Sequence, residues 1–252
     1  MPETDYEPPK NEYLQQTHRP LNGLMFLVPL LLFFHVGLWL GNEQEIYSLL
    51  AMNHLSRLLQ FFLGVTTPYL PAVAVVAVLL LQHVLRKDKW QFRPGVLLGM
   101  AGESAIWMMP LMALVLLVNK MSLPAGAALT VATEISGTTL QRLLLAVGAG
   151  IYEEFIFRLL FIGLAMLLLV KVFNLRKEPV ALAAVVASGL CFSLYHFTAD
   201  QLLQMHESFP WFEFVFRALA GVYLGLVYLY RGFGIAVGAH AAWDIYVFLV
   251  AA

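Results

Sequence analysis

The sequence contains little charge. Only 12% of its 252 residues are charged, 60% are hydrophobic, and the formal net charge is −1. A soluble domain carries roughly twice this fraction of charged residues, so the composition excludes a soluble globular fold. Without a basic excess the chain also lacks the attraction for phosphates on which nucleic-acid binding depends, and no nucleic-acid partner is expected.

Cysteine is almost absent as well. Cys191 is the only one in the sequence, which excludes an internal disulfide and a metal cluster built on several thiolates. It stands within an apolar run, where a cysteine usually behaves as a small buried hydrophobic side chain. We therefore expect Cys191 to be buried.

Apolar runs are abundant instead. A membrane-spanning helix needs about 20 predominantly apolar residues. Stretches that approach this length lie at residues 21–40, 67–85, 95–118, 140–170, 180–197, 211–230 and 234–250. The more amphipathic segment 46–63 predicts an interfacial helix. We therefore expect an all-α fold, a polytopic transmembrane helical bundle of about seven spans that is integral to the lipid bilayer.

Positive charges fall on one side of these spans. With seven spans, ten Lys and Arg residues share the side of the N-terminus, while only Arg57 and Lys120 lie in the opposite loops. The positive-inside rule then places the N-terminus in the cytoplasm and the C-terminus outside. The expected organisation is a polar cytoplasmic tail (1–20), N-terminal transmembrane helices with the interfacial helix (21–139) and a C-terminal helical core (140–252).

Three ionisable residues interrupt the fourth apolar stretch: Glu153, Glu154 and Arg158. Each charge in mid-span costs about 2.5–3.5 kcal/mol on insertion, which indicates that these residues have a function. Glu154 and Arg158 have the i, i+4 spacing of a helical ion pair, with the acid on the N-terminal side. Adjacent residues lie about 100° apart around a helix, so Glu153 is left unpaired and can face a cavity.

Two later spans each carry a histidine. His196 lies four residues after Phe192, and His240 lies four residues before Asp244, so each ring shares a helix face with that neighbour. Three helices packed around one polar cavity would bring Glu153 and both histidines together. Such a set of carboxylates and imidazoles suits either metal binding or the activation of a water molecule.

Depth in the membrane adds a further expectation. Counted from the extracytoplasmic ends, Glu153 lies about 13 residues into its span and His240 about 12 residues from the C-terminus, each about 18–20 Å at 1.5 Å per residue. His196 reaches a comparable depth only if its helix continues. We therefore expect a cavity in the middle of the membrane and a helix that extends past Phe197.

Other polar side chains in the spans have simpler interpretations. We expect His35 and His83 to be hydrogen-bonded packing residues. Glu103 and Arg217 stand in different spans and are opposite in charge, so we expect them to form an ion pair with each other.

Three motifs stand in order, each in a separate predicted span: Glu153-Glu154-x-x-x-Arg158, Phe192-x-x-x-His196 and His240-x-x-x-Asp244. In this combination the chain resembles the CAAX-protease and bacteriocin-processing (CPBP, or Abi) family of intramembrane endopeptidases. The resemblance covers roughly residues 140–250, and the first three spans contain no matching motif. It implies a helical bundle with a catalytic cavity inside the membrane, and membrane-associated proteins or peptides as substrates.

The resemblance also implies a role for each motif. Glu153 and His196 would activate a water molecule. Glu154 and Arg158 would support that pair, and His240, together with the residue at position 244, would hold the developing oxyanion.

Position 244 departs from the usual family pattern. The third motif more often ends in Asn, whose amide can donate a hydrogen bond to an oxyanion, whereas Asp244 can donate only when it is protonated. Asp244 can alternatively orient His240 through a hydrogen bond to its imidazole ring.

The residues leave the use of a metal open. Glu153, His196 and His240 form a sufficient ligand set for catalytic zinc, and the family is often described as metalloproteases. The same groups suffice for a mechanism in which Glu153 and His196 polarise water without a metal. We favour the second mechanism, because Glu154 and Arg158 already balance the charge of the site.

The leading functional interpretation is an intramembrane endopeptidase that hydrolyses peptide bonds of membrane-associated protein or peptide substrates, including bonds near a substrate's C-terminus. One alternative is a proton-coupled membrane transporter, since buried Glu, His and Arg residues also form proton relays. The lack of internal repeats disfavours it. A second alternative is a catalytically silent membrane scaffold, which would have no reason to keep these costly ionisable groups.

Overall fold

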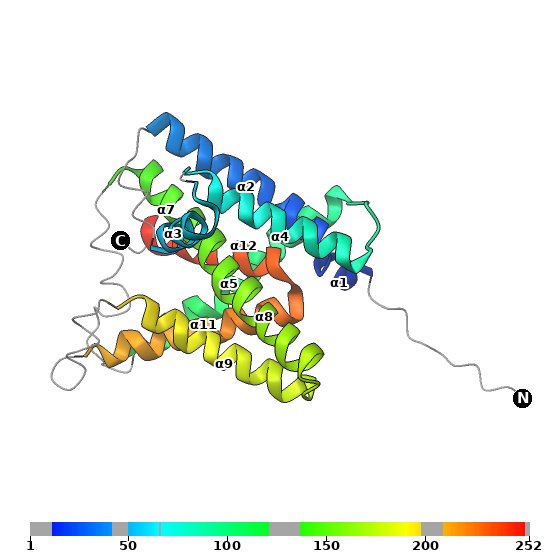
Figure 1. Cartoon of the computed structure of the whole chain (residues 1–252). Helices are drawn as coiled ribbons and strands as arrows, with labels where there is room; N and C mark the ends of the chain where they lie inside the picture. Colours follow the sequence, from blue (N-terminus) through cyan, green and yellow to red (C-terminus); the bar gives the residue numbers. More distant parts are fainter. Residues whose placement is uncertain (1–11, 42–49, 66, 121–136, 198–208, 250–252) are drawn as a thin grey trace, which may run out of the picture.

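The computed structural model describes residues 12–41, 50–65, 67–120, 137–197 and 209–249 (Figure 1). All regular elements in these residues are helices, and no strand occurs among them. The all-α prediction is confirmed. Residues 1–11 of the predicted tail and residues 46–49 of the predicted interfacial segment lie outside the described residues.

The N-terminal part of the chain forms helices that pack on one side of the bundle. They are α1 (Glu12–Thr17), α2 (Pro20–Gly41), α3 (Leu50–Leu63), α4 (Leu70–Arg86) and α5 (Pro94–Lys120). Figure 1 shows α2 and α4 side by side, and α1 packs on α2 and α5.

The C-terminal part begins with one long helix of changing geometry. Thr138 caps its start, because the Thr138 side chain accepts a hydrogen bond from the Gln141 backbone and the Gln141 side chain accepts one from the Thr138 backbone. The helix is α-helical in α7 (Thr139–Glu154) and π-helical in η2 (Phe155–Ile162). It continues through α8 (Gly163–Ala165) and the π-helical η3 (Met166–Val172). π-Helical turns inside helices often coincide with functional sites, and η2 follows directly on the two glutamates.

Three further helices complete the described fold: α9 (Lys177–Tyr195), α11 (Trp211–Arg231) and α12 (Phe233–Leu249). Helix α12 packs along both α7 and α5, and α9 packs along α11. Since α2 also contacts α7 and α9 contacts η2, the long helix lies in the middle of the bundle, between α2 with α4 and α9 with α11 (Figure 1).

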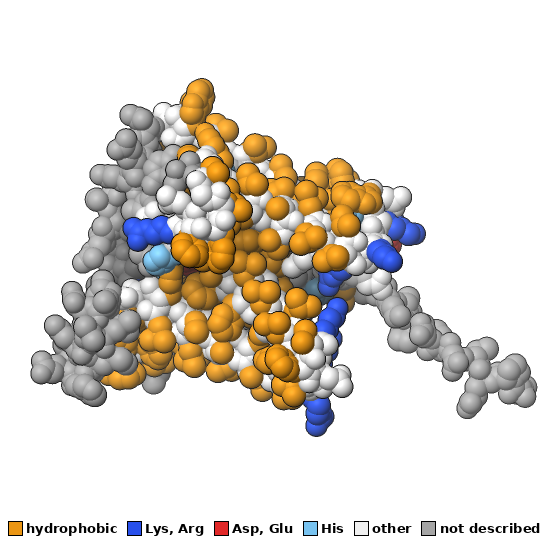
Figure 2. Space-filling model, viewed as in Figure 1, with side chains coloured by type: hydrophobic (Ala, Val, Ile, Leu, Met, Phe, Trp, Pro, Cys, Tyr) orange, Lys and Arg blue, Asp and Glu red, His pale blue; other side chains and the backbone are white. Residues whose placement is uncertain are grey.

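Five helical stretches of the described residues are long and apolar enough to cross a membrane: Pro20–Leu40, Pro94–Val115, Thr139–Val172, Lys177–Tyr195 and Trp211–Arg231. The shorter apolar helices α4 and α12 stand at the second and seventh predicted spans. Large apolar side chains cover much of the surface (Figure 2), and Trp39 and Leu98 are 74% and 76% exposed. Such a surface suits lipid and not water. The chain is an integral membrane protein, and about seven spans fit its helices.

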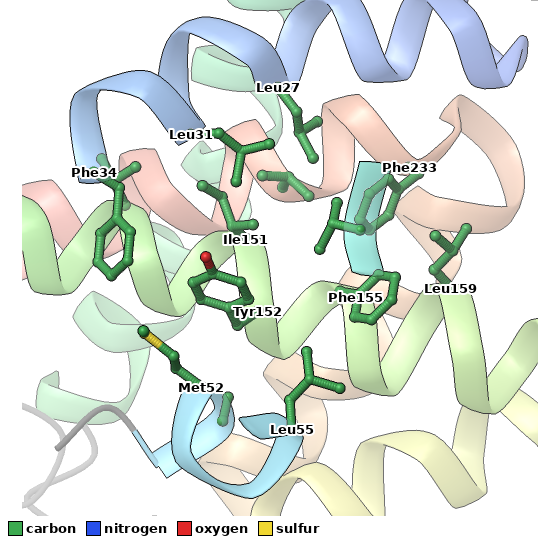
Figure 3. Packing of buried hydrophobic residues seen from close by; sticks show 14 of the residues in the cluster. Leu27, Leu31, Phe34, Met52, Leu55, Ile151, Tyr152, Phe155, Leu159 and Phe233 are labelled. Carbon is green, nitrogen blue, oxygen red and sulfur yellow. The ribbon is translucent and has the colours of Figure 1, made fainter. Parts of the chain in front are cut away.

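The largest hydrophobic cluster lies on one face of α7 and η2 (Figure 3). Ile151, Tyr152 and Phe155 pack there against buried side chains of α2 and α3. Because this face of the long helix is occupied, the two glutamates that follow Tyr152 project toward α9 and α12. The same packing buries Met52 of α3; the location of α3 at the membrane interface stays a prediction.

Small residues allow the helices of the site to approach one another closely. A Cβ added to Gly150 of α7 would lie 2.9 Å from the backbone nitrogen of Ala241 in α12. A Cβ added to Gly221 of α11 would lie 2.9 Å from the Cα of Gly189 in α9. Close approach of this kind is the usual function of glycine in membrane helix contacts. These glycines allow α12 to pack closely on α7 and α9 to pack closely on α11.

Two predictions about α9 are wrong. The helix ends at Tyr195 and does not extend past Phe197; residues 198–208 lie outside the described residues. The His196 side chain bonds the Phe192 carbonyl, one of the last carbonyls of α9, and so caps the helix where it ends. Cys191 is exposed, because the buried face of α9 runs through Ser188 and Phe192 and Cys191 points away from it.

Candidate active site

The motif residues come together from three neighbouring helices. Glu153 and Glu154 end α7, Arg158 lies in η2, His196 follows α9, and His240 and Asp244 lie on α12. Four of them are buried inside the bundle, and the side chains of His196 and Asp244 are partly buried.

Glu154 joins two of the motifs. Its Oε2 lies 3.1 Å from Nε of Arg158, as the i, i+4 spacing predicts, although this ion pair does not have hydrogen-bond geometry. Its Oε1 accepts a hydrogen bond of 2.7 Å from Nδ1 of His240. Arg158 also donates to the Gly221 carbonyl at 3.1 Å and lies 4.7 Å from the centre of the Phe192 ring. Helices α7, α9, α11 and α12 are thereby connected around one buried ion pair.

Glu153 faces the two histidines. Its Oε2 lies 3.8 Å from Nε2 of His196 and 3.8 Å from Nε2 of His240. Adjacent residues of a helix face directions about 100° apart. Glu154 therefore faces a different direction from Glu153 and pairs with Arg158, as predicted. The structure thus brings the carboxylate and both imidazoles into one cluster.

Hydrogen bonds at Nδ1 determine which nitrogen of each imidazole faces Glu153. His196 donates from Nδ1 to the Phe192 carbonyl at 2.7 Å, since a carbonyl oxygen can only accept. The Nδ1 of His240 is held by Glu154. Both Nε2 atoms are then acceptors in the neutral rings, and a protonated His240 donates from Nε2 as well.

Asp244 lies on the same side of His240 as Glu153. Its Oδ2 is 3.5 Å from Nε2 of His240, longer than an ordinary hydrogen bond. The partner that orients the ring is Glu154, which holds Nδ1. Sequence reasoning missed this contact and assigned Glu154 to Arg158 alone.

The predicted ion pair between Glu103 and Arg217 is wrong. Glu103 pairs with Arg231, which contacts both of its carboxylate oxygens, and it also accepts hydrogen bonds of 2.8 Å from Trp107 and Tyr13. Burial and the bond to Glu103 raise the pKa of Tyr13 to about 12. Arg217 stands 14 positions before Arg231, about 21 Å along α11, so only Arg231 reaches Glu103.

Arg217 lies instead at the edge of the candidate site. Its guanidinium carbon is 5.3 Å from the centre of the Phe197 ring, next to His196. Its positive charge acts on the carboxylates of Glu153 and Glu213. Sequence reasoning did not find this residue as part of the site, and the only signal for it was an arginine inside an apolar span.

The two histidines that we expected to be packing residues differ from each other. His35 forms a hydrogen bond of 3.0 Å with the Tyr152 hydroxyl, as predicted. His83 is completely buried and packs edge-on against Trp90, 4.4 Å between ring centres. Neither nitrogen of His83 has a hydrogen-bond partner among the described residues, so that part of the prediction is wrong.

The spacing of the cluster bears on metal binding. In the described part of the chain no three His, Cys, Asp or Glu side chains are placed to hold a metal ion. Zinc ligands lie about 2.0–2.2 Å from the metal, which sets them about 3.3–3.6 Å apart in a tetrahedron, less than the 3.8 Å between Glu153 and each histidine. Glu153, His196 and His240 therefore have the donor atoms of a zinc site, but Glu153 lies farther from each histidine than two zinc ligands normally lie from each other.

Comparison with protein families gives an independent view of the motifs. The family model described as type II CAAX prenyl endopeptidase Rce1-like matches residues 135–246, a range that contains all three motifs. No curated protein and no solved structure matches the chain. The family match agrees with the resemblance that the motifs carry. Over residues 135–246 this membrane protein is therefore similar to the Rce1-like type II CAAX prenyl endopeptidases, which is consistent with the CPBP proteases.

Proposed function

We propose that the protein is an intramembrane endopeptidase in which Glu153 and His196 activate a water molecule to hydrolyse peptide bonds of membrane-associated proteins or peptides. The observation that carries the proposal is the convergence of Glu153 Oε2 with Nε2 of His196 and of His240, each at 3.8 Å. The match to the CAAX endopeptidase family supports the reaction class. A site enclosed by apolar helices favours substrates that reach it from the membrane. The similarity to CAAX endopeptidases supports a cleaved bond near the substrate's C-terminus.

A water molecule fits the gap between Glu153 and His196. With hydrogen bonds of about 2.8 Å to both acceptors, it spans the 3.8 Å separation at an angle of about 85°. Its protons then point at the two bases, and its lone pairs point away from them, where a substrate carbonyl can lie. Glu153 takes one proton as the water oxygen attacks the carbonyl carbon, while His196 holds the other.

The negative charge that develops on the former carbonyl oxygen needs a donor. Protonated His240 supplies one from Nε2. Its positive charge is stabilised by the carboxylates of Glu154, Asp244 and Glu153, at 2.7, 3.5 and 3.8 Å from its ring nitrogens. When the intermediate collapses, the C–N bond breaks and the proton on Glu153 passes to the leaving nitrogen. The carboxylic acid that forms passes its remaining proton to His196, so the products are a carboxylate and an amine.

The decisive experiment is peptide hydrolysis by the purified protein, tested with a library of membrane-associated peptides. Glu153→Gln keeps the shape of the side chain and removes the base, so turnover per folded molecule is expected to fall at least about 100-fold. The matched control is Glu178→Gln, which makes the same change at an exposed residue in the first turn of α9. This variant should retain full activity. Full activity of the Glu153→Gln variant would refute the proposed mechanism.

We also propose that this reaction needs no metal, because the site balances its own charge through Glu154 and Arg158. Hydrolysis should then continue after extensive treatment with a metal chelator. Loss of activity in chelator, restored by added zinc, would overturn the metal-free form of the proposal and retain the endopeptidase.

A further inference from the structure

A second polar site lies away from the motif residues, between the start of α2 and the end of α4. It is a pocket of about 360 Å³ lined by Gln15, His18, Arg19, Arg86 and Asp88. These residues come from α1, from the turn that precedes α2, and from the end of α4 with the segment that follows it. None of them belongs to the three motifs.

Two contacts hold the wall of this pocket in place. Arg86 donates from Nη1 to the backbone carbonyl of His18 at 2.8 Å, which ties the end of α4 to the start of α2. His18 in turn donates from Nε2 to the carbonyl of Tyr230 at 3.0 Å, near the end of α11. The ends of three helices therefore meet at the pocket.

The pocket has a positive charge and unused donors. Arg19 and Arg86 contribute two positive charges and Asp88 one negative charge, so the lining carries a net charge of +1 with His18 neutral. A guanidinium has five N–H donors, of which Arg86 uses one on His18. The Arg19 side chain has no hydrogen bond or ion pair to another described residue. Arginine forks match phosphate oxygens especially well.

The position of the pocket at the ends of membrane helices indicates which kind of phosphate it can bind, a lipid headgroup. Arg19 directly precedes the apolar span that begins at Pro20, and Arg86 is the last residue of the apolar helix α4. Both guanidinium groups therefore lie where the hydrocarbon core gives way to the polar headgroup layer. Figure 2 shows most of the visible Lys and Arg side chains along one edge of the molecule, beyond the apolar side chains, and a smaller basic patch on the opposite edge.

We propose that this pocket binds the phosphodiester headgroup of an anionic phospholipid. Arg19 and Arg86 bind the phosphate oxygens, and Asp88 accepts a hydrogen bond from a headgroup hydroxyl. Phosphatidylglycerol has this chemistry, because it combines one negative charge with hydroxyl groups. A lipid held in this way bridges α2 and α4, so its binding stabilises the folded bundle.

The test is thermal unfolding of the purified full-length protein in neutral detergent, with phosphatidylglycerol, phosphatidylcholine or inorganic phosphate added. Phosphatidylglycerol at about ten times its Kd should raise the Tm of the wild type by about 4 °C, and the other two additions by much less. Arg19→Gln should abolish this shift. It is the decisive variant, because Arg86→Gln also removes the bond to His18 and lowers the Tm by itself.

Lys171→Gln is the matched control. Lys171 is an exposed basic residue in the last turn of η3 and does not line the pocket. It should keep the full shift, whereas a general attraction between basic side chains and anionic lipid would weaken both variants alike. Equal shifts in the two variants, no shift in the wild type, or an equal shift with inorganic phosphate would each overturn the proposal. The outcome does not depend on hydrolysis, so it stands or falls separately from the proposed enzyme activity.

Discussion

Two adjacent glutamates have different surroundings, which predicts different effects of the same substitution. Glu154→Gln leaves the completely buried Arg158 without its counter-charge. Removal of one partner from a buried ion pair costs about 3–5 kcal/mol, so the Tm and the yield of folded protein should fall. Glu153→Gln should instead lose turnover and keep its stability. The measurements are thermal unfolding and hydrolysis per folded molecule, and a greater loss of stability in Glu153→Gln would contradict this assignment.

Asp244 allows a second prediction at this scale. Because Glu154 already holds Nδ1 of His240, the ring does not need Asp244 for its orientation. The amide of Asp244→Asn can donate to an oxyanion, so this variant should retain at least about a third of the wild-type kcat/KM. Asp244→Leu removes the carboxylate beside protonated His240 and supplies no donor in its place, so it should lose about 100-fold, the effect of losing one group that stabilises the oxyanion. If the two variants are equally impaired, an amide donor at position 244 does not replace the carboxylate.

Only part of the site could be predicted from the sequence, because contacts within one helix follow from its geometry and contacts between helices depend on packing. The separation of Glu153 from Glu154 and the pairing of Glu154 with Arg158 depend on the geometry of a single helix, so the sequence was sufficient. The bond from His240 to Glu154 joins residues 86 positions apart and depends on how α12 packs against α7. The partner of Glu103 depended on packing in the same way, and there the prediction was wrong.

At the scale of helices, the contact between α9 and α11 predicts the effect of a single methyl group. A Cβ on Gly189 would lie 2.7 Å from the backbone nitrogen of Val222 and 2.9 Å from the carbonyl oxygen of Ala218. Since these are backbone atoms, Gly189→Ala must push the helices apart. It should cost about 1–3 kcal/mol and reduce hydrolysis, because His196 follows α9 and the Gly221 carbonyl holds Arg158.

Gly102→Ala in α5 is the control for that substitution. A Cβ there meets nothing within 4 Å, and alanine is the better helix former, so this variant should unfold at or slightly above the wild-type temperature. If Gly189→Ala matches it in both Tm and activity, close contact between α9 and α11 is not needed for the site.

The helices themselves were largely predictable, because each apolar run has to satisfy its backbone hydrogen bonds within the membrane. Two features were not. The π-helical segment η2 has the apolar sequence of an ordinary span, and nothing in that sequence signals its wider turns. The end of α9 at Tyr195 depends on the bond from His196 to the Phe192 carbonyl, which composition does not reveal.

At the scale of the whole molecule, the order of elements explains how a polar site can exist inside an apolar bundle. The long helix of α7 and η2 has one face on the hydrophobic cluster with α2 and α3, and its other face meets α9 and α12. The charges of the motifs lie on that second face and are surrounded by protein. Lipid therefore contacts apolar side chains, and the cost of the buried charges is offset within the bundle.

Membrane orientation is the last prediction, and it concerns the whole chain. Most of the basic side chains visible in Figure 2 lie along one edge of the bundle, and the positive-inside rule makes this the cytoplasmic edge. Reporter fusions after Lys89, Lys120, Arg176 and Glu207 should then lie inside, outside, inside and outside. Two consecutive fusions on the same side would contradict the arrangement of seven spans. Alternation in the opposite phase would keep the seven spans and reverse the orientation, and the proposed lipid pocket would then face the outer leaflet.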